Sequence, residues 1–169
     1  MSKPLPQKSD QIPTSSLEKQ FDFPVSVSWV KKMQFIGRDE FHHSIVIDTG
    51  PELGGERTGP TPGRLLLMAV AACTAVDVVD ILAKSRQKLI ALTVYCGGVQ
   101  NDEYPKFYKE IRLKYVLRGI SLDRTRVERA IKLSEEKYCS VGATLNGKAK
   151  IITQYEIEEK EEEEEKAQI

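Results

Sequence analysis

Three cysteines, Cys73, Cys96 and Cys139, are the side chains of this 169-residue sequence best suited to covalent chemistry. A thiolate is a strong nucleophile, whereas a thiol buried among apolar groups keeps its proton and is inert. The three are widely spaced and form no Cys-x-x-Cys pair. His42 and His43 are adjacent on a predicted strand, so they are expected to point to opposite faces. We therefore expect no metal site, and the thiols are left as the candidates for chemistry.

Cys73 lies at the centre of "TPGRLLLMAVAACTAVDVVDIL", which has helical spacing and is apolar on most of its circumference. Thr61 and Pro62 are typical of a helix N-cap and first helical position, so a helix is predicted to begin there. Burial raises the pKa of a thiol, and an ionised Asp77 four residues later raises it further. Either Cys73 is a small buried side chain of the core, or a nearby cation lowers its pKa and makes it reactive.

The other two cysteines have different sequence environments. Cys139 follows "SEEKY" at a predicted helix break, an exposed position. If a short helix begins at Cys139, the free N–H groups of its first turn stabilise the thiolate, and otherwise the thiol is an ordinary one. Cys96 alternates with Leu92 and Val94 on one face of a predicted strand, which favours packing in the core.

The elements that must position these thiols follow from periodicity and turn residues. Strands are predicted over residues 24–40 and 41–48, then the long helix from 62 to about 85–88. A hairpin over 89–119 turns around "NDEYP", a second helix capped by Asp123 runs to 138, and a short helical turn precedes a last strand over 148–158. The order ββαββααβ, with strands in hairpins, predicts an α+β fold in which a mostly antiparallel sheet wraps around a long buried central helix.

Charge and composition divide the chain into three parts. The tail segment "EIEEKEEEEEK" carries eight Glu and two Lys, although the whole chain has a formal net charge of zero. We predict an extension without fixed structure over residues 1–20, a single domain over 21–157 and a solvated acidic tail over 158–169. The start has no apolar secretory region, and Asp77 and Asp80 interrupt the most apolar segment, so we expect a cytoplasmic protein outside the membrane. Basic residues form no aromatic-interleaved stripe, so nucleic-acid binding is not expected.

Two segments together resemble a known family. "PTPGRLLLMAVAACTAVDVVDILAKSRQ" and "AIKLSEEKYCSVGATL" are similar to the two cysteine motifs of the OsmC/Ohr thiol peroxidases. In the first motif a Pro-initiated helix reaches a small-small-Cys triplet, here Ala71-Ala72-Cys73. The resemblance covers roughly residues 24–157, and the order of elements also resembles that of the family fold.

The resemblance implies a thiol-dependent peroxidase of the oxidative stress response that needs no cofactor. By its motif, Cys73 is implied to be the peroxidatic thiol that an organic hydroperoxide oxidises to a sulfenic acid. Cys139 is implied to be the resolving thiol that closes a disulfide, which an external dithiol then reduces. The family also implies a homodimer with active sites at the subunit interface. The alternative is a non-catalytic, stress-related dimer that binds a small apolar ligand in the same interface pocket.

The resemblance is weakest at the charged residues around the thiol. The family has an activating arginine in a Gly-Arg-Asp setting, which "FIGRDEF" offers as Arg38. The family also has a glutamate in the first turn of the central helix that orients this arginine, and here the position is Arg64. Either Arg64 supplies the cation itself, or a loop acid such as Glu56 replaces the missing partner, or the peroxidase activity is reduced.

Overall fold

The structure, a computed structural model, describes residues 23–159, and the predicted N-terminal extension and most of the acidic tail lie outside these residues. The chain divides after Thr61 into two compact units, where the sequence predicted a single domain over 21–157. Each unit has its own three-stranded sheet, and no strand is shared between the two sheets among the described residues. Hydrogen bonds between these strands therefore run only within each sheet.

The first unit is an antiparallel sheet of β1 (Val25–Lys31), β2 (Gln34–Asp39) and β3 (Ser44–Ile47). The prediction of one strand over residues 24–40 is wrong, because a tight turn separates β1 from β2. Lys32 has a positive φ of 48°, and the indole N–H of Trp29 donates to the Lys32 carbonyl at 2.8 Å. A residue in the left-handed region cannot continue a strand, so β1 ends before Lys32. Apolar residues alternate on both sides of Lys32, and this alternation hid the turn from the sequence analysis.

A second turn joins β2 to β3 and holds both histidines. His42 has a positive φ of 67°, and the Asp39 carboxylate accepts hydrogen bonds from the backbone N–H groups of Phe41 and His43. The histidines therefore precede β3 instead of lying on the predicted strand over 41–48. The His43 ring lies 2.8 Å from the same carboxylate of Asp39.

The loop after β3 is organised by one buried carboxylate. Asp48 accepts hydrogen bonds from the backbone N–H groups of Thr58, Thr49 and Glu56 and from the Thr58 hydroxyl, at 2.8–3.1 Å. These hydrogen bonds, the Thr58 N–H foremost, lower the pKa of Asp48 to about 2. The loop also contains a short 3₁₀ turn, η1 (Pro51–Leu53), and it leads to the start of the second unit.

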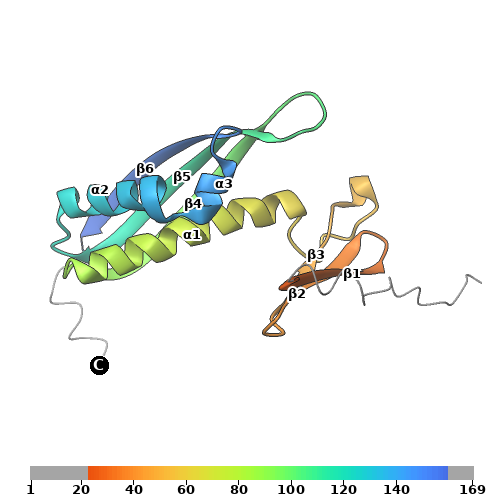
Figure 1. The fold of residues 1–169 in the computed structure, drawn as a ribbon, viewed down its shortest axis with the longest axis horizontal. Coiled ribbons are helices and arrows are strands. Elements are labelled where there is room, and N and C mark those ends of the chain that lie inside the picture. The colour runs from red at the N-terminus through yellow and green to blue at the C-terminus, as the bar shows by residue number, and fades with distance from the viewer. Residues whose placement is uncertain (1–22, 160–169) are drawn as a thin grey trace, which may run out of the picture. The chain divides into compact units, whose positions relative to one another are not determined.

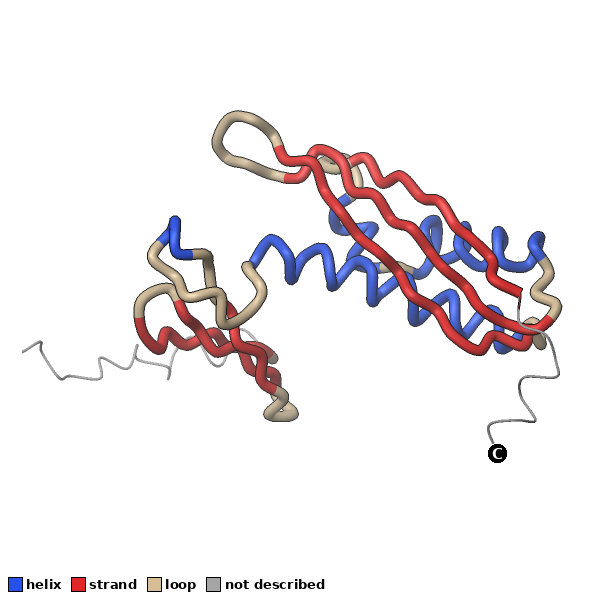
Figure 2. The backbone as a smooth tube through the Cα atoms, turned by 180° about the vertical axis from the view of Figure 1, so that it is seen from behind, coloured by secondary structure: helices blue, strands red, loops and turns tan. Residues whose placement is uncertain are grey.

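The second unit packs its helices on one face of its sheet (Figure 1). Its elements are α1 (Pro62–Lys84), β4 (Lys88–Gln100), β5 (Tyr108–Ile120), α2 (Arg124–Leu133), the π-helical turn η2 (Ser134–Tyr138), α3 (Ser140–Leu145) and β6 (Lys150–Glu159). β4 and β5 pair antiparallel, whereas β5 and β6 pair in parallel. The three strands lie together in front of the helices when seen from behind (Figure 2).

These elements confirm the α+β class and the mostly antiparallel pairing. α1 begins at Pro62 as predicted, and Asp123 caps α2 by accepting from the N–H groups of Thr125 and Arg126. β6 runs to Glu159, two residues beyond the predicted end of the domain. The parallel pair follows from the path of the chain, because α2, η2 and α3 carry it back across the sheet before β6.

The core of the second unit lies between α1, α2 and the sheet. One side of α1 is buried through Val70, Val78 and Leu82, which belong to the same apolar cluster as Ile111 and Leu117 of β5. Since apolar burial is the main source of folding free energy, this side fixes α1 against the sheet. The cysteine of α1 lies at the edge of this cluster.

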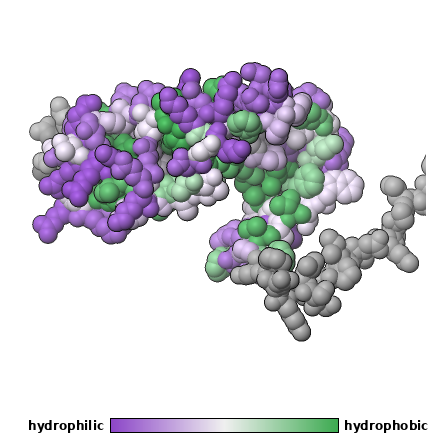
Figure 3. All heavy atoms as spheres, turned by 45° about the horizontal axis from the view of Figure 1, so that its top comes forward, coloured by the Kyte–Doolittle hydropathy of each residue, from purple (hydrophilic) through white to green (hydrophobic). Residues whose placement is uncertain are grey.

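The other side of α1 is apolar and exposed. Met68, Val76 and Val79 are 54%, 69% and 45% exposed in the single chain, so the sheet and α2 bury one side of α1 and leave this side uncovered. By length and composition alone, with a mean hydropathy of 2.2, α1 would also suit a membrane span. Hydrophobic side chains, green in Figure 3, reach the surface in patches between hydrophilic ones. Large exposed apolar patches occur at protein-binding, membrane-binding and ligand-binding surfaces.

Candidate functional site

The site is built where α1 passes α3, and it brings two of the predicted residues together. Cys73, in the middle of α1, is partly buried, and its Sγ lies 4.0 Å from the Ser140 Oγ. Ser140 directly follows Cys139, and the Cys73 and Cys139 thiols are near enough that each shifts the pKa of the other. Two thiols 66 positions apart in the sequence are therefore neighbours in the fold.

The π-helical turn η2 delivers Cys139 to this position. The Cys139 N–H donates to the Ser134 carbonyl at 2.8 Å, which closes η2, and Cys139 then serves as the N-cap of α3. Its Sγ accepts from the Gly142 N–H at 3.2 Å. A short helix therefore does begin at Cys139, as one sequence alternative required, but the residue is only 5% exposed and is not the exposed thiol that we predicted.

Hydrogen bonds make Cys73 the more acidic thiol of the pair. Burial raises the pKa of Cys73, but the Val141 N–H, the Cys139 thiol and the Ser140 hydroxyl all stabilise the thiolate. Asp77, four residues later on α1, opposes them as predicted. The net pKa of Cys73 lies below the usual thiol value, because the start of α3 supplies donors that α1 itself lacks.

Cys139 has the opposite tendency. Burial raises the pKa of the Cys139 thiol to about 11, although the Gly142 N–H lowers it, and the hydrogen bond to Cys73 raises it. Cys139 therefore keeps its proton near neutral pH. The pair consists of one thiol whose pKa is lowered and one whose pKa is raised, and a lowered pKa favours the thiolate, which is the nucleophilic form.

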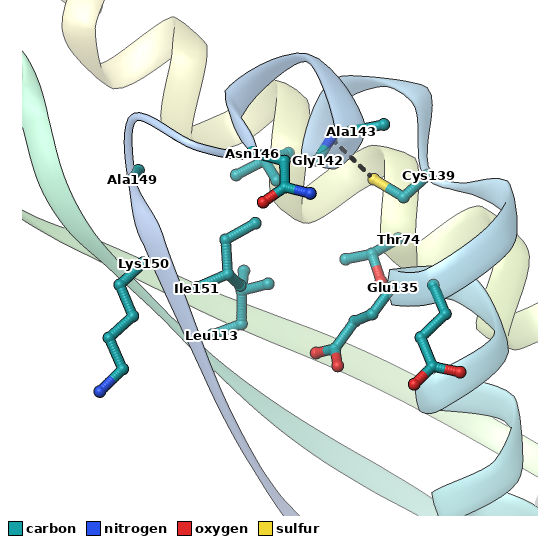
Figure 4. Close-up of a pocket in the computed structure, with 12 residues that line it drawn as sticks. Thr74, Leu113, Glu135, Cys139, Gly142, Ala143, Asn146, Ala149, Lys150 and Ile151 are labelled. Atoms are coloured by element: carbon teal, nitrogen blue, oxygen red, sulfur yellow. Dashed lines mark hydrogen bonds between the residues drawn. The ribbon is translucent and has the colours of Figure 1, made fainter.

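A cavity of about 500 Å³ adjoins Cys139 (Figure 4). Leu113 of β5 and Ile151 of β6 give it an apolar side, while Glu135 of η2 and Lys150 of β6 also line it. Its size is within the range that binds small organic molecules. Within residues 23–159 there is no cluster of three His, Cys, Asp or Glu side chains able to hold a metal ion.

The remaining predicted residues lie elsewhere. Cys96 is on β4, paired in register with Leu113, where burial raises its pKa. Arg64 lies in the first turn of α1 and is exposed, and Arg38 is an exposed residue of β2 in the first unit. The roles of both arginines at the thiol stay predictions.

Sequence reasoning missed the groups that hold the two thiols. Ser140 and Val141 act through the first turn of α3, which the segment "YCSVGATL" signals only by its small and polar residues. Thr74 and Ser134 form a buried hydrogen bond of 2.8 Å between α1 and η2. No periodicity reveals such a contact, because the two residues are far apart in the sequence.

Comparisons with known proteins agree with this architecture. The family model for OsmC-like proteins matches residues 54–154. Protein YhfA of Escherichia coli (strain K12) is 35% identical over 131 residues, which cover 78% of this chain and 95% of YhfA.

Solved structures share the fold. A crystal structure of a protein from Aquifex aeolicus VF5 is 30% identical, with a TM-score of 0.72, and the match covers 83% of this chain and 100% of that one. An organic hydroperoxide resistance protein OsmC from Legionella pneumophila is 14% identical, with a TM-score of 0.62 over 80% of this chain and 97% of its own. With more than half of its residues matched by the family model and a relative at 35% identity, the chain belongs to the OsmC-like family.

Proposed function

We propose that this protein is a thiol peroxidase that reduces organic hydroperoxides. The observation that carries the proposal is that Cys73, whose pKa is lowered, neighbours Cys139, which stays protonated. A lowered pKa favours the thiolate, which is the nucleophilic form, and a neighbouring second thiol provides a partner for a disulfide. Membership of the OsmC-like family, some of whose structural neighbours are named organic hydroperoxide resistance proteins, supports the same activity.

The proposed reaction has three steps. The Cys73 thiolate attacks the terminal oxygen of the hydroperoxide, the O–O bond breaks, and the alkoxide leaves and takes a proton to become an alcohol. The Cys139 thiol then attacks the sulfur of the Cys73 sulfenic acid, and its proton leaves with the hydroxide as water. Finally an external dithiol reduces the Cys73–Cys139 disulfide by thiol–disulfide exchange and is itself oxidised to a disulfide.

A cation at the thiolate would strengthen the first step, because it stabilises charge on both the thiolate and the departing alkoxide. Arg38 is our candidate for this cation, and Arg64, at the position of the family glutamate, is the second. A low-dielectric interface would strengthen the interaction of either guanidinium with the sulfur.

We further propose that the protein works as a homodimer with its sites at the interface. The exposed apolar side of α1 supports this, and so does the sheet of the first unit, where Val25, Val27 and Trp29 on one face of β1 are 62–68% exposed. A stable interface that covers such faces would bury about 2,000 Å² or more. Sedimentation at micromolar concentration is expected to give twice the mass of the chain, and the mass of one chain would contradict the dimer.

The alternative function is a non-catalytic dimer that binds a small apolar ligand. The replacement of the family glutamate by Arg64 and the presence of Asp77, which disfavours the Cys73 thiolate, support this alternative. The 500 Å³ cavity beside Cys139 offers space for such a ligand.

One titration separates the two functions. The native, reduced protein has three thiols, which are counted before and after one equivalent of cumene hydroperoxide. The peroxidase is expected to lose two thiols, those of Cys73 and Cys139, and to keep Cys96. If all three thiols remain, the peroxidase proposal is wrong and ligand binding is favoured.

A further inference from the structure

A chain of buried hydrogen bonds crosses the second unit beside the two thiols. The Tyr115 Oη lies 2.6 Å from the Thr74 Oγ1, the Thr74 Oγ1 lies 2.8 Å from the Ser134 Oγ, and the Ser134 hydroxyl donates to the Asp77 carboxylate at 2.8 Å. Tyr115, Thr74 and Ser134 are at most 1% exposed. The chain thus links β5, α1 and η2 in the interior of the unit.

The direction of these hydrogen bonds is fixed by the carboxylate at one end. An ionised carboxylate only accepts, so Ser134 donates its proton to Asp77 and accepts from Thr74, which in turn accepts from Tyr115. Burial raises the pKa of the Tyr115 phenol, so this donor keeps its proton. Hydrogen bonds that all point one way in a dry interior strengthen one another.

Ser134 connects this chain to the second thiol. Its side chain is held by Thr74 and Asp77 of α1, while its carbonyl accepts the Cys139 N–H at 2.8 Å. Thr74 directly follows Cys73. One serine therefore ties the segment that carries Cys139 to the part of α1 that carries Cys73.

The position of Asp77 also needs an explanation, because its charge disfavours the thiolate of both cysteines. As the final acceptor of the chain, it satisfies the Ser134 hydroxyl, which has no access to water. A π-helical turn is rare, and such turns are frequent at functional sites. An anchored Ser134 explains how η2 is kept in place.

We propose that Asp77, Ser134, Thr74 and Tyr115 are positioning residues that hold Cys139 in the geometry needed to form a disulfide with Cys73. A disulfide requires Cα atoms within about 7 Å and a restricted dihedral angle, so small displacements of Cys139 disfavour its formation. Without the chain, η2 samples positions in which the two sulfurs do not meet, and the effective concentration of one thiol at the other falls. The inference rests on the disulfide of the proposed function, but it does not depend on the peroxide.

The test measures disulfide formation without peroxide, in a Cys96→Ala background that leaves two thiols. Oxidised glutathione forms a mixed disulfide with one thiol and releases one reduced glutathione. The second thiol then displaces another, so that one Cys73–Cys139 bond forms for two glutathione molecules released. The equilibrium constant of this exchange with glutathione reports the effective concentration of one thiol at the other.

Ser134→Ala and Thr74→Val are expected to lower this constant by roughly tenfold, because each leaves a buried partner without its hydrogen bond. Thr74→Ser keeps the hydroxyl and is expected to restore the constant to within about twofold of the parent. Thr93→Val, an exposed change on β4, is the matched control. Should a buried variant fail to fold, the partly exposed Asp77→Ala is used instead and is expected to show the same loss.

The outcomes separate this inference from the proposed function. The inference would be overturned if the equilibrium constant equalled that of the parent in Ser134→Ala, Thr74→Val and Asp77→Ala. This outcome does not depend on whether the protein consumes hydroperoxide. A lowered equilibrium constant in Thr74→Val that Thr74→Ser restores supports the inference, even if the protein consumes no hydroperoxide. A loss in Thr74→Ser equal to that in Thr74→Val would also overturn it, because the effect would then follow packing and not the hydroxyl.

Discussion

Cys73 and Cys96 are both partly buried thiols of the second unit, but their surroundings push them toward opposite behaviour. Burial raises the pKa of each. At Cys73 the donors from the start of α3 and from Cys139 outweigh burial, and the pKa falls below the usual value. At Cys96, on a strand packed against the core, burial is the cause that acts and the pKa rises. The difference teaches that hydrogen-bond donors from neighbouring segments can lower the pKa of a partly buried thiol that burial alone would raise.

The largest effect is expected when Cys73, the more acidic thiol, is removed. Cys73→Ser is expected to reduce hydroperoxide consumption to the uncatalysed rate, because a hydroxyl at this position is not ionised near neutral pH and cannot replace the thiolate. Consumption of cumene hydroperoxide, followed with a dithiol reductant, measures this. Turnover by the Ser variant at the wild-type rate would refute the role of Cys73.

The next test asks whether a cation adds to the donors of α3. Arg38→Ala is expected to raise the pKa of Cys73 toward or above the free value of about 8.5, and Arg64→Ala is expected to raise it less. Arg64 precedes Cys73 by nine residues, about two and a half turns, so it lies on the far side of its own helix. The rate of iodoacetamide alkylation against pH gives both values. A larger effect of Arg64 would reverse the assignment, and no effect of either would favour the ligand-binding alternative.

Much of this framework could be predicted from sequence, because it depends on local signals. Pro62 and Asp123 mark where α1 and α2 begin, and alternation locates the β4–β5 hairpin. The turn at Lys32 could not be predicted, because only its positive φ distinguishes it from the strands on either side. The separation of the strands into two sheets was also not predicted, since the pairing of distant strands is decided by the fold as a whole.

The site was predictable only in part, for a physical reason. The resemblance to the two family motifs singled out Cys73 and Cys139, and the structure makes these two thiols neighbours. Their relative acidity depends on the Val141 N–H and the Ser140 hydroxyl, which reach Cys73 only through tertiary packing. Sequence reasoning therefore required a cation for a reactive Cys73, whereas hydrogen bonds from α3 already lower its pKa.

A smaller effect is expected when the neighbouring donor is removed. Cys139→Ala deletes the hydrogen bond that stabilises the Cys73 thiolate, so the pKa of Cys73 is expected to rise, while Cys139→Ser keeps a donor and is expected to change it less. As pH increases in the wild type, Cys73 is expected to be alkylated first and Cys139 only near pH 11. Mass spectrometry of the alkylated peptides assigns each rate. Alkylation of Cys139 before Cys73 would contradict this order.

The smallest effect is expected at Cys96, and it completes the comparison. Cys96→Ala removes a thiol whose pKa is raised and which lies on β4, away from the donors of α3, so peroxide turnover and the alkylation profile of Cys73 are expected to stay at wild-type values. Stability is expected to fall instead, because Cys96→Ala removes a partly buried sulfur that packs against the core. The expected decrease in the free energy of unfolding is about 1 kcal/mol. Chemical denaturation measures that decrease, and the peroxide assay provides the second reading. A loss of turnover in a folded Cys96→Ala protein would mean that burial alone does not make a thiol inert here, and the contrast between the two regions would fail.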